Sequence, residues 1–221
     1  MSDTRRGVGR PRAVARPASG LSPREEVLAA AAELFTAQGY SATSTREIAE
    51  RAGIRQASIY HYFKGKEDIL AELLESTVRP SLEAARALLG SPAPAASRLW
   101  ALCHRDARLL CSGPHNLGAL YLLPEADRFG VFQELRSALR DCYADLLTAV
   151  APGLPQAERA VRAQLVFSVV ESVILIRRDA SAPVPGTLAE ATADAALRVG
   201  GVADGELPAV RDLGRTLAAD G

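Results

Sequence analysis

Side chains that could bind phosphate are concentrated in one short segment, ERAGIRQASIYHYFKGKEDI, residues 50–69. It contains four consecutive aromatic residues, Tyr60, His61, Tyr62 and Phe63, followed by both lysines of the chain, Lys64 and Lys66. Every other Lys or Arg position of the chain is Arg. Hydroxyl and ammonium groups are common partners of phosphate oxygens in nucleic acids. The segment therefore suggests a surface that grips a nucleic-acid backbone.

The residues just before these aromatics are types that read base edges. Gln56 can make a bidentate contact to adenine, Ala57 can meet a thymine methyl group, and Ser58 can bond to any base. Such residues read sequence when they open a helix that enters the major groove. We therefore expect Gln56, Ala57, Ser58 and His61 to face the bases.

The elements that would position these side chains are two short helices joined by a sharp turn. Ser44 is placed to cap the first of them, with Glu47 reaching back to form a capping box. Gly53 ends this helix, because glycine adopts a positive φ at little cost. The next helix is expected over QASIYHYF, residues 56–63, which gives a helix-turn-helix unit.

The aromatic segment could also be an ordinary core helix with its lysines in solvent. Ile59 and Phe63, at i and i+4, already fill one apolar face of that helix. The three aromatics between and beside them fall outside this stripe, and this favours DNA binding. We expect six side chains to contact phosphates: Thr45, Arg46, Tyr60, Tyr62, Lys64 and Lys66. Thr45 and Arg46 open a helix whose N-terminal amides also favour an anion.

The charge distribution supports a nucleic-acid partner. The net charge is zero, but residues 1–66 hold 11 basic and 6 acidic side chains, whereas the remainder holds 15 and 20. A basic surface gains affinity for DNA by phosphate contact and counterion release. Residues 1–20 contain five Arg and no helical apolar period, so we expect a disordered basic arm that either is solvated or touches DNA.

The rest of the chain favours an all-α fold. After the capping signal at Ser22, apolar residues recur at helical spacing throughout, and no strand pattern appears. We expect Pro80 to kink or interrupt the helix that follows Lys66. Further helices are expected at approximately these ranges: 96–112, 115–123, 128–150, 155–179 and 187–199.

Several classes of function are disfavoured. No apolar run reaches the length of a membrane span, and the N-terminal charges are not followed by the apolar core of a secretory signal. Three cysteines without metal-like pairing suit a reducing cytoplasm. We find no catalytic motif, metal-ligand spacing or phosphate-binding glycine loop, and so we expect no enzyme activity, metal or cofactor.

The segment TSTREIAERAGIRQASIYHYFKGKEDIL resembles the DNA-binding domain of the TetR (tetracycline repressor-like) family of transcription regulators. The matching features are TREIAERAGI, SIYHYF and KGKEDIL, and the resemblance covers about residues 22–75. One departure is Arg55, where the family often has a small capping residue. Arg55 could instead reach a phosphate or a guanine.

The resemblance implies a homodimer that binds a palindromic operator, usually represses, and is released by a small-molecule effector. It divides the chain into a helix-turn-helix domain (21–66), a helical effector-binding and dimerisation domain (67–203) and a C-terminal tail (204–221). The helices at 155–179 and 187–199 correspond in position to the pair that forms the dimer bundle of the family. An alternative is a DNA-binding dimer that needs no ligand.

Effector candidates are aromatic or polar residues of the middle helices: Trp100, Cys103, His104, Tyr121, Phe132, Tyr143, Phe167 and Glu171. For each aromatic residue, core packing is the competing interpretation. Glu171 interrupts the apolar run LVFSVVESVILI, and a buried carboxylate needs a partner. It could face a ligand, pair across a dimer interface or bond to a neighbouring helix.

Overall fold

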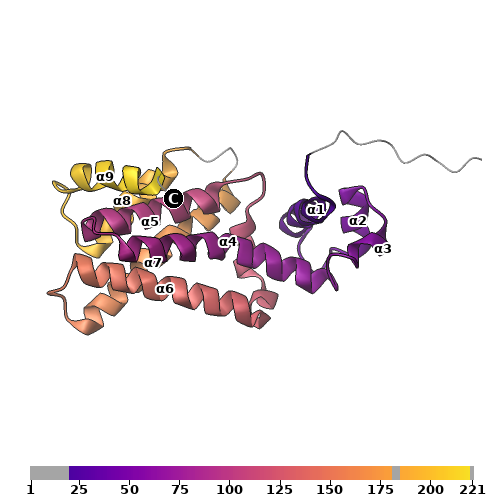
Figure 1. The fold of residues 1–221 in the computed structure, drawn as a ribbon, viewed down its shortest axis with the longest axis horizontal. Helices are drawn as coiled ribbons and strands as arrows, with labels where there is room; N and C mark the ends of the chain where they lie inside the picture. Colours follow the sequence, from indigo (N-terminus) through magenta and orange to yellow (C-terminus); the bar gives the residue numbers. More distant parts are fainter. Residues whose placement is uncertain (1–19, 181–184, 220–221) are drawn as a thin grey trace, which may run out of the picture.

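The computed structural model describes residues 20–180 and 185–219, which contain nine α-helices, two short 3₁₀ helices and no strand. The predicted all-α class is therefore confirmed. Figure 1 shows two parts, a small one at one end and a larger one, with one long helix running between them. The predicted basic arm lies outside the described residues except for Gly20.

The small part, which we call the head, comprises residues 23–65. It contains α1 (Pro23–Gln38), α2 (Thr45–Ala52) and α3 (Gln56–Ile59). The larger part, the body, begins within the long helix α4 and comprises the following elements: α4 (Lys66–Gly90), α5 (Ala95–Cys111), η1 (Leu117–Leu122), η2 (Pro124–Arg128), α6 (Gly130–Val150), α7 (Gln156–Asp179), α8 (Leu188–Gly200) and α9 (Leu207–Ala219).

Both predicted capping boxes of the head are present. The Ser22 side chain accepts from the Glu25 amide, and Ser44 does the same for Glu47, while each glutamate accepts from the amide of its cap residue. These bonds satisfy amides that a helix start otherwise leaves without a partner. Gly53 ends α2 with φ 73° and ψ 24°, the left-handed conformation expected of it.

The core of the head is made by one face of each helix. Val27 and Phe35 of α1, Ile48 of α2 and Ile59 of α3 are buried together, and Phe63 closes the cluster after α3. Burial of these side chains fixes the angle between α2 and α3. Residues on the opposite faces of these helices are thereby held at the surface of the head.

The body packs α5 at its centre, against α4, α6, α7, α8 and α9. Trp100 of α5 is fully buried, and its indole N–H donates to Asp194 of α8 over 2.8 Å. Gly214 of α9 lies against the same ring. The segment 204–221, predicted to be a tail, thus contains helix α9, whose apolar side covers α5.

Three expectations about helices differ from the structure. The base-reading helix is a single turn, Gln56–Ile59, followed by turns rather than a helix to Phe63. Pro80 was expected to kink or interrupt the helix after Lys66, and of these two alternatives the interruption is absent, because α4 continues from Lys66 to Gly90. Pro80 is exposed, so water can bond to the Ser76 carbonyl that lacks an N–H partner. The expected helix at 115–123 is the 3₁₀ helix η1.

Candidate nucleic-acid interface and effector pocket

The helix-turn-helix geometry places the start of α3 beside the start of α2. The Gln56 side-chain amide donates to the Thr45 hydroxyl over 3.2 Å, which joins the two helix N-termini into one surface. Gln56 and Ala57 are exposed and Ser58 is half-buried. The residue types expected to read bases therefore lie together and open to solvent.

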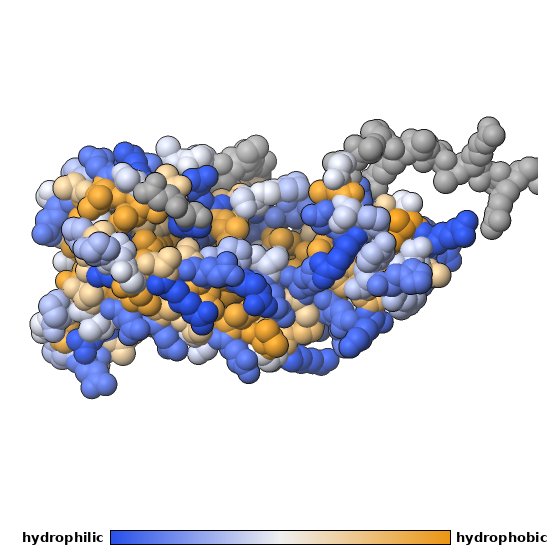
Figure 2. All heavy atoms as spheres, in the orientation of Figure 1, coloured by the Kyte–Doolittle hydropathy of each residue, from blue (hydrophilic) through white to orange (hydrophobic). Residues whose placement is uncertain are grey.

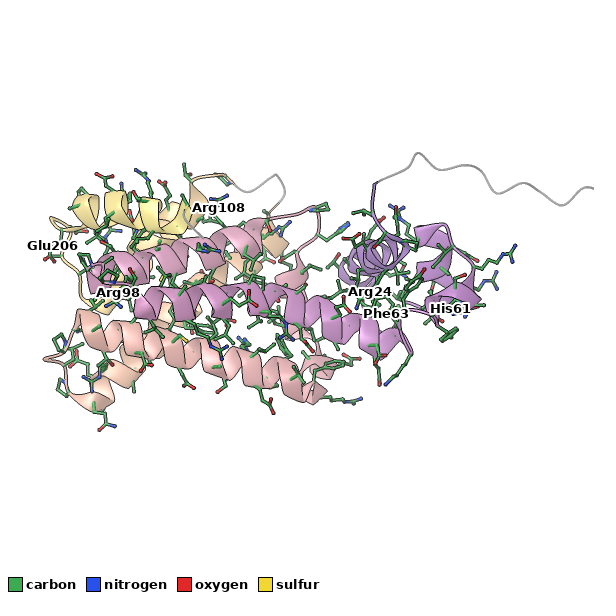
Figure 3. The ribbon with its side chains drawn as sticks, viewed as in Figure 1. Arg24, His61, Phe63, Arg98, Arg108 and Glu206 are labelled. Carbon is green, nitrogen blue, oxygen red and sulfur yellow. The ribbon has the colours of Figure 1, made fainter. Side chains whose placement is uncertain are left out.

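The aromatic residues after α3 are exposed as expected. Tyr60 retains 55% of its accessible surface and Tyr62 40%, while Ile59 and Phe63 are buried. His61 is also exposed and lies at the part of the head remote from the body (Figure 3). This division by face agrees with the helical-wheel argument even though the helix is shorter than predicted.

Arg55 occupies the N-cap position of α3 with an extended backbone and no side-chain cap. Its carbonyl accepts from the Ser58 amide over 2.8 Å, so the turn backbone starts the helix. The Arg55 side chain is exposed. The guanidinium is therefore not needed for folding this turn.

Three other predicted phosphate contacts differ in their surroundings. Arg46 is exposed and pairs with Glu50 over 2.9 Å. Lys64 is exposed at the head surface, and its amide donates to Asp68 at the start of α4. Lys66 is instead turned into the head, where its ammonium donates to the carbonyls of Tyr40 and Thr43, each over 2.8 Å. We therefore do not assign Lys66 to a phosphate.

Contacts that fix the head on the body were not expected from the sequence. Arg24 of α1 forms an ion pair with Glu72 of α4, and its guanidinium lies 5.0 Å from the Phe63 ring centroid (Figure 3). The Ser41 hydroxyl donates to Glu125 of η2 over 3.0 Å. Nothing in the local sequence indicates these pairs, because their members are 48 and 84 positions apart.

Seven of the eight effector candidates separate into two groups, and the eighth, Tyr143, is a buried core residue of α6. Trp100, Cys103 and His104 lie in the packed core of α5, where the Trp100 and His104 rings stack with centroids 4.8 Å apart. Burial raises the pKa of the Cys103 thiol and lowers the pKa of His104. For these three residues the core interpretation fits the structure.

The second group surrounds Arg136 of α6, a residue that was not predicted from the sequence. We call these five residues the Arg136 cluster: Tyr121, Phe132, Arg136, Phe167 and Glu171. The Arg136 Nε donates to Glu171 over 3.0 Å, and its guanidinium lies 5.3 Å from the Tyr121 ring centroid. Phe132 packs on Tyr121 with ring centroids 5.2 Å apart. Glu171 therefore bonds to a neighbouring helix, one of the alternatives considered for it.

The Arg136 cluster separates two cavities. An inner cavity of about 20 Å³ also touches Phe167, Asp106 and Thr77, and an outer pocket of about 330 Å³ opens along α7 at Ser168 and Leu175. Tyr121, Arg136 and Glu171 line both. These three side chains therefore stand between the inner cavity and the outer pocket.

Asp106 is a buried carboxyl at the inner cavity that sequence reasoning also missed. Its neighbour Tyr143, a core residue of α6, donates its hydroxyl to it over 2.6 Å. Burial raises the pKa of Asp106 to about 6, against smaller lowering effects of Ser81 and Tyr143. A signal was present, since Asp106 shares a helix face with Cys103 and Leu110.

No helix in the described ranges is long and apolar enough to cross a membrane. The same residues contain no group of three or more His, Cys, Asp or Glu side chains arranged to hold a metal ion. Cys103, Cys111 and Cys142 are all free.

Comparison with known proteins gave three kinds of match. The family model described as bacterial regulatory proteins, tetR family, matches residues 27–73. The HTH-type transcriptional repressor KstR2 of Rhodococcus jostii is 31% identical over 131 residues, which is 57% of this chain and 64% of that protein. The crystal structure of Mycobacterium smegmatis AmtR is 46% identical, with a TM-score of 0.82 over 94% of this chain and 97% of that one.

The extent of these matches differs. The KstR2 of Mycolicibacterium smegmatis is 45% identical over 58 residues, 26% of this chain and 28% of that protein. The matched part of this chain thus spans less than two thirds of the length of either KstR2 protein. The likeness to AmtR, in contrast, includes the body.

Proposed function

Because this chain belongs to the TetR family of bacterial regulatory proteins, we propose that it represses transcription as a homodimer on a palindromic operator and is released by a small-molecule effector. Membership of this family makes it a DNA-binding transcription regulator rather than an enzyme. The cytoplasm, where operator DNA is accessible, is the compartment that goes with this role.

The observation that carries the proposal is the exposed surface around α3. Gln56, Ala57 and His61 face solvent at the tip of the head, with Ser58 half-buried beside them. We assign these four to base edges in the major groove. We assign Tyr60, Tyr62, Lys64, Thr45 and Arg46 to phosphates, and Arg55 to either a phosphate or a guanine.

An exposed apolar stripe on α7 supports dimerisation. Val161 is 60% exposed and Leu165 49%, and Leu175 and Ile176 continue the stripe two turns beyond Ser168. A helix face of this kind marks a protein interface when it is contiguous. A two-fold pairing of α7 and α8 would present two heads to the two halves of a palindrome.

The effector is assigned to the Arg136 cluster. The outer pocket of about 330 Å³ is within the range of ligand sites, about 300–1,000 Å³. It offers a carboxylate, a guanidinium and a phenol at its base: Glu171, Arg136 and Tyr121. The second candidate function is a ligand-independent dimer, which the small inner cavity of about 20 Å³ favours.

Selection of bound sequences from random duplex DNA by the full-length protein tests the proposed function. We expect enrichment of a palindrome, and fluorescence anisotropy on that DNA should show sequence-specific binding. Gln56→Ala should weaken binding by about 1–3 kcal/mol and relax one base position, because the bidentate pair with a base is removed. Gln156→Ala, an exposed glutamine at the start of α7, is the matched control.

Tyr60→Ala provides a second variant, which should weaken binding to all sequences alike. Lack of any enriched sequence, or full affinity in both head variants, would contradict the proposed function.

A further inference from the structure

A larger pocket, of about 420 Å³, lies where the head meets the body. Leu28 and Ala32 of α1 form one wall, Leu73 of α4 another, and Leu117 of η1 a third. Figure 2 shows apolar residues at the surface where these two parts meet. The volume is that of a ligand site rather than of a packing defect.

The walls come from both parts of the molecule. Only Thr77 and Leu110 are shared with the inner cavity of the Arg136 cluster. The α1 residues belong to the unit that carries α3, whereas Leu117 and Arg177 belong to the body. An occupant would therefore contact the DNA-reading unit and the body at once.

The lining of this pocket is mostly apolar, with polar side chains at Ser76, Thr77, Ser112 and His115. Arg177 of α7 is the only Lys, Arg, Asp or Glu among its lining residues. Its Nη1 donates to the carbonyls of Leu110 and Ser112 over 2.9 and 2.8 Å, and its Nη2 donates to that of Gly113. These bonds hold the guanidinium at the pocket wall. Carbonyl oxygens accept hydrogen bonds but do not neutralise the charge.

The neighbouring Arg178 shows the difference, because it is paired with Asp179 over 2.8 Å. Within residues 20–180 and 185–219, no carboxylate forms such a pair with Arg177. Within the same described residues, the Nε–H of Arg177 donates no hydrogen bond. A fixed, unneutralised guanidinium beside apolar walls is complementary to a molecule with an apolar body and one anionic group.

The location of Arg177 links the pocket to the proposed dimer face. Arg177 follows directly after Leu175 and Ile176 of the exposed stripe on α7. On the opposite wall, α1 is joined to α4 by the Arg24–Glu72 pair. A molecule seated between them would change how the head is held relative to α7, and with it the separation of the two heads.

We propose that this pocket binds an apolar molecule carrying one carboxylate or similar anion on Arg177, and that occupancy lowers the affinity for operator DNA. The second part rests on the proposed function. By linkage, DNA must then lower the affinity for the ligand by the same factor.

The first experiment is isothermal titration calorimetry on the full-length protein without DNA. The probes are dodecanoate and dodecyltrimethylammonium, each below its critical micelle concentration, and dodecanol below its solubility limit. We expect dodecanoate to bind once per chain and at least tenfold more tightly than the two head-group controls. Equal affinity for the three probes, or no binding of dodecanoate, would overturn the proposal.

Two substitutions locate the binding site. Arg177→Gln should weaken dodecanoate at least tenfold, whereas Arg178→Gln on the same helix end should leave it unchanged. Because Arg177 also holds three carbonyls, a variant that does not disturb them is needed. Ala29→Phe, at an exposed position of the pocket wall, should block binding, and Ala87→Phe at an exposed position of α4 is its control.

The second experiment measures operator affinity by anisotropy with saturating dodecanoate. We expect at least a fivefold loss in the unmodified protein and no loss in Ala29→Phe. An unchanged operator affinity at saturation would overturn the proposal. Failure to select any operator would contradict the proposed function alone, since the calorimetry needs no DNA and still decides whether the site exists.

Discussion

The ammonium nitrogen of Lys66 lies 2.8 Å from the carbonyl oxygen of Tyr40 and 4.2 Å from the centroid of the same residue's ring. Lys66 thereby ties the first turn of α4 to the segment between α1 and α2. A second bond, to the Thr43 carbonyl, closes this connection. The two lysines of the chain thus have different roles, and substitution can separate them.

Lys66→Met should destabilise the head by about 1–3 kcal/mol, because two carbonyls lose a charged donor and Tyr40 loses its cation. Native-state hydrogen exchange of amides in α1 and α2 measures this. Lys64→Met, at an exposed position, should change the same exchange free energies by less than about 0.5 kcal/mol. Equal protection of the head in the two variants would contradict a structural role for Lys66.

Lys64→Met should weaken operator binding, because one phosphate per head no longer has an ammonium partner. The slope of log K against log salt concentration should fall in magnitude by about 0.9 for each phosphate that is no longer neutralised. Anisotropy titrations at several salt concentrations measure the slope. A variant with lower affinity but the unmodified slope would show that Lys64 acts on something other than a phosphate.

Replacing two apolar residues of the α7 stripe should dissociate the proposed dimer. Val161→Glu combined with Leu165→Glu places like charges opposite each other across a two-fold interface. Each introduced carboxylate would also lose its hydration in that interface. Sedimentation velocity should then give monomers. Val131→Glu, at a similarly exposed position of α6, should sediment like the unmodified protein. Dimers that survive the double substitution would place the interface elsewhere.

Gly214→Ala should destabilise the body by about 1–3 kcal/mol through overpacking. A Cβ atom at this position would lie 2.5 Å from Cε3 of Trp100. Urea unfolding followed by fluorescence of this single tryptophan measures the loss. Gly130→Ala, where a Cβ meets nothing within 4 Å, is the control and should stay within about 0.5 kcal/mol.

Asp106→Asn should change the pH dependence of stability. The folded-state pKa of Asp106 is raised to about 6 from 3.8, so the folded protein holds a proton between these values that the unfolded chain releases. The contribution of Asp106 to the free energy of unfolding is therefore largest below pH 3.8 and is lost as the pH rises to about 6.

The stability of the Asn variant relative to the unmodified protein should therefore increase between about pH 4 and pH 6 and then level off. The total increase is at most about 3 kcal/mol. Urea unfolding of both proteins from about pH 4 to about pH 8 measures the difference, in which the titration of other groups cancels. A difference independent of pH would contradict the raised pKa.

The local signals in the sequence were reliable where a few adjacent residues decide the structure. Ser44, Glu47 and Gly53 define α2 through bonds to their own backbone, and all three have the predicted geometry. The exposure of Tyr60 and burial of Ile59 followed from helical spacing alone. Such features depend on neighbours within one turn.

Contacts between distant segments were not predictable in the same way. Lys66 and Lys64 are indistinguishable by type and position, and only the packing of α4 beside Tyr40 directs one inward. The partner of Glu171 required knowing that α6 brings Arg136 alongside α7. Trp100 was predicted as a candidate ligand residue because the sequence does not indicate that α8 and α9 cover it.

The continuity of α4 through Pro80 has a mechanical consequence. A helix of 25 residues is about 37 Å long at about 1.5 Å per residue, and it carries the head at one end and body packing at the other. As a stiff lever it converts a tilt of about 5° at its body end into a displacement of about 3 Å at the head. That is close to the spacing of about 3.4 Å between successive base pairs, so a rearrangement of the body too small to disturb its core can move a reading head by one step along the DNA.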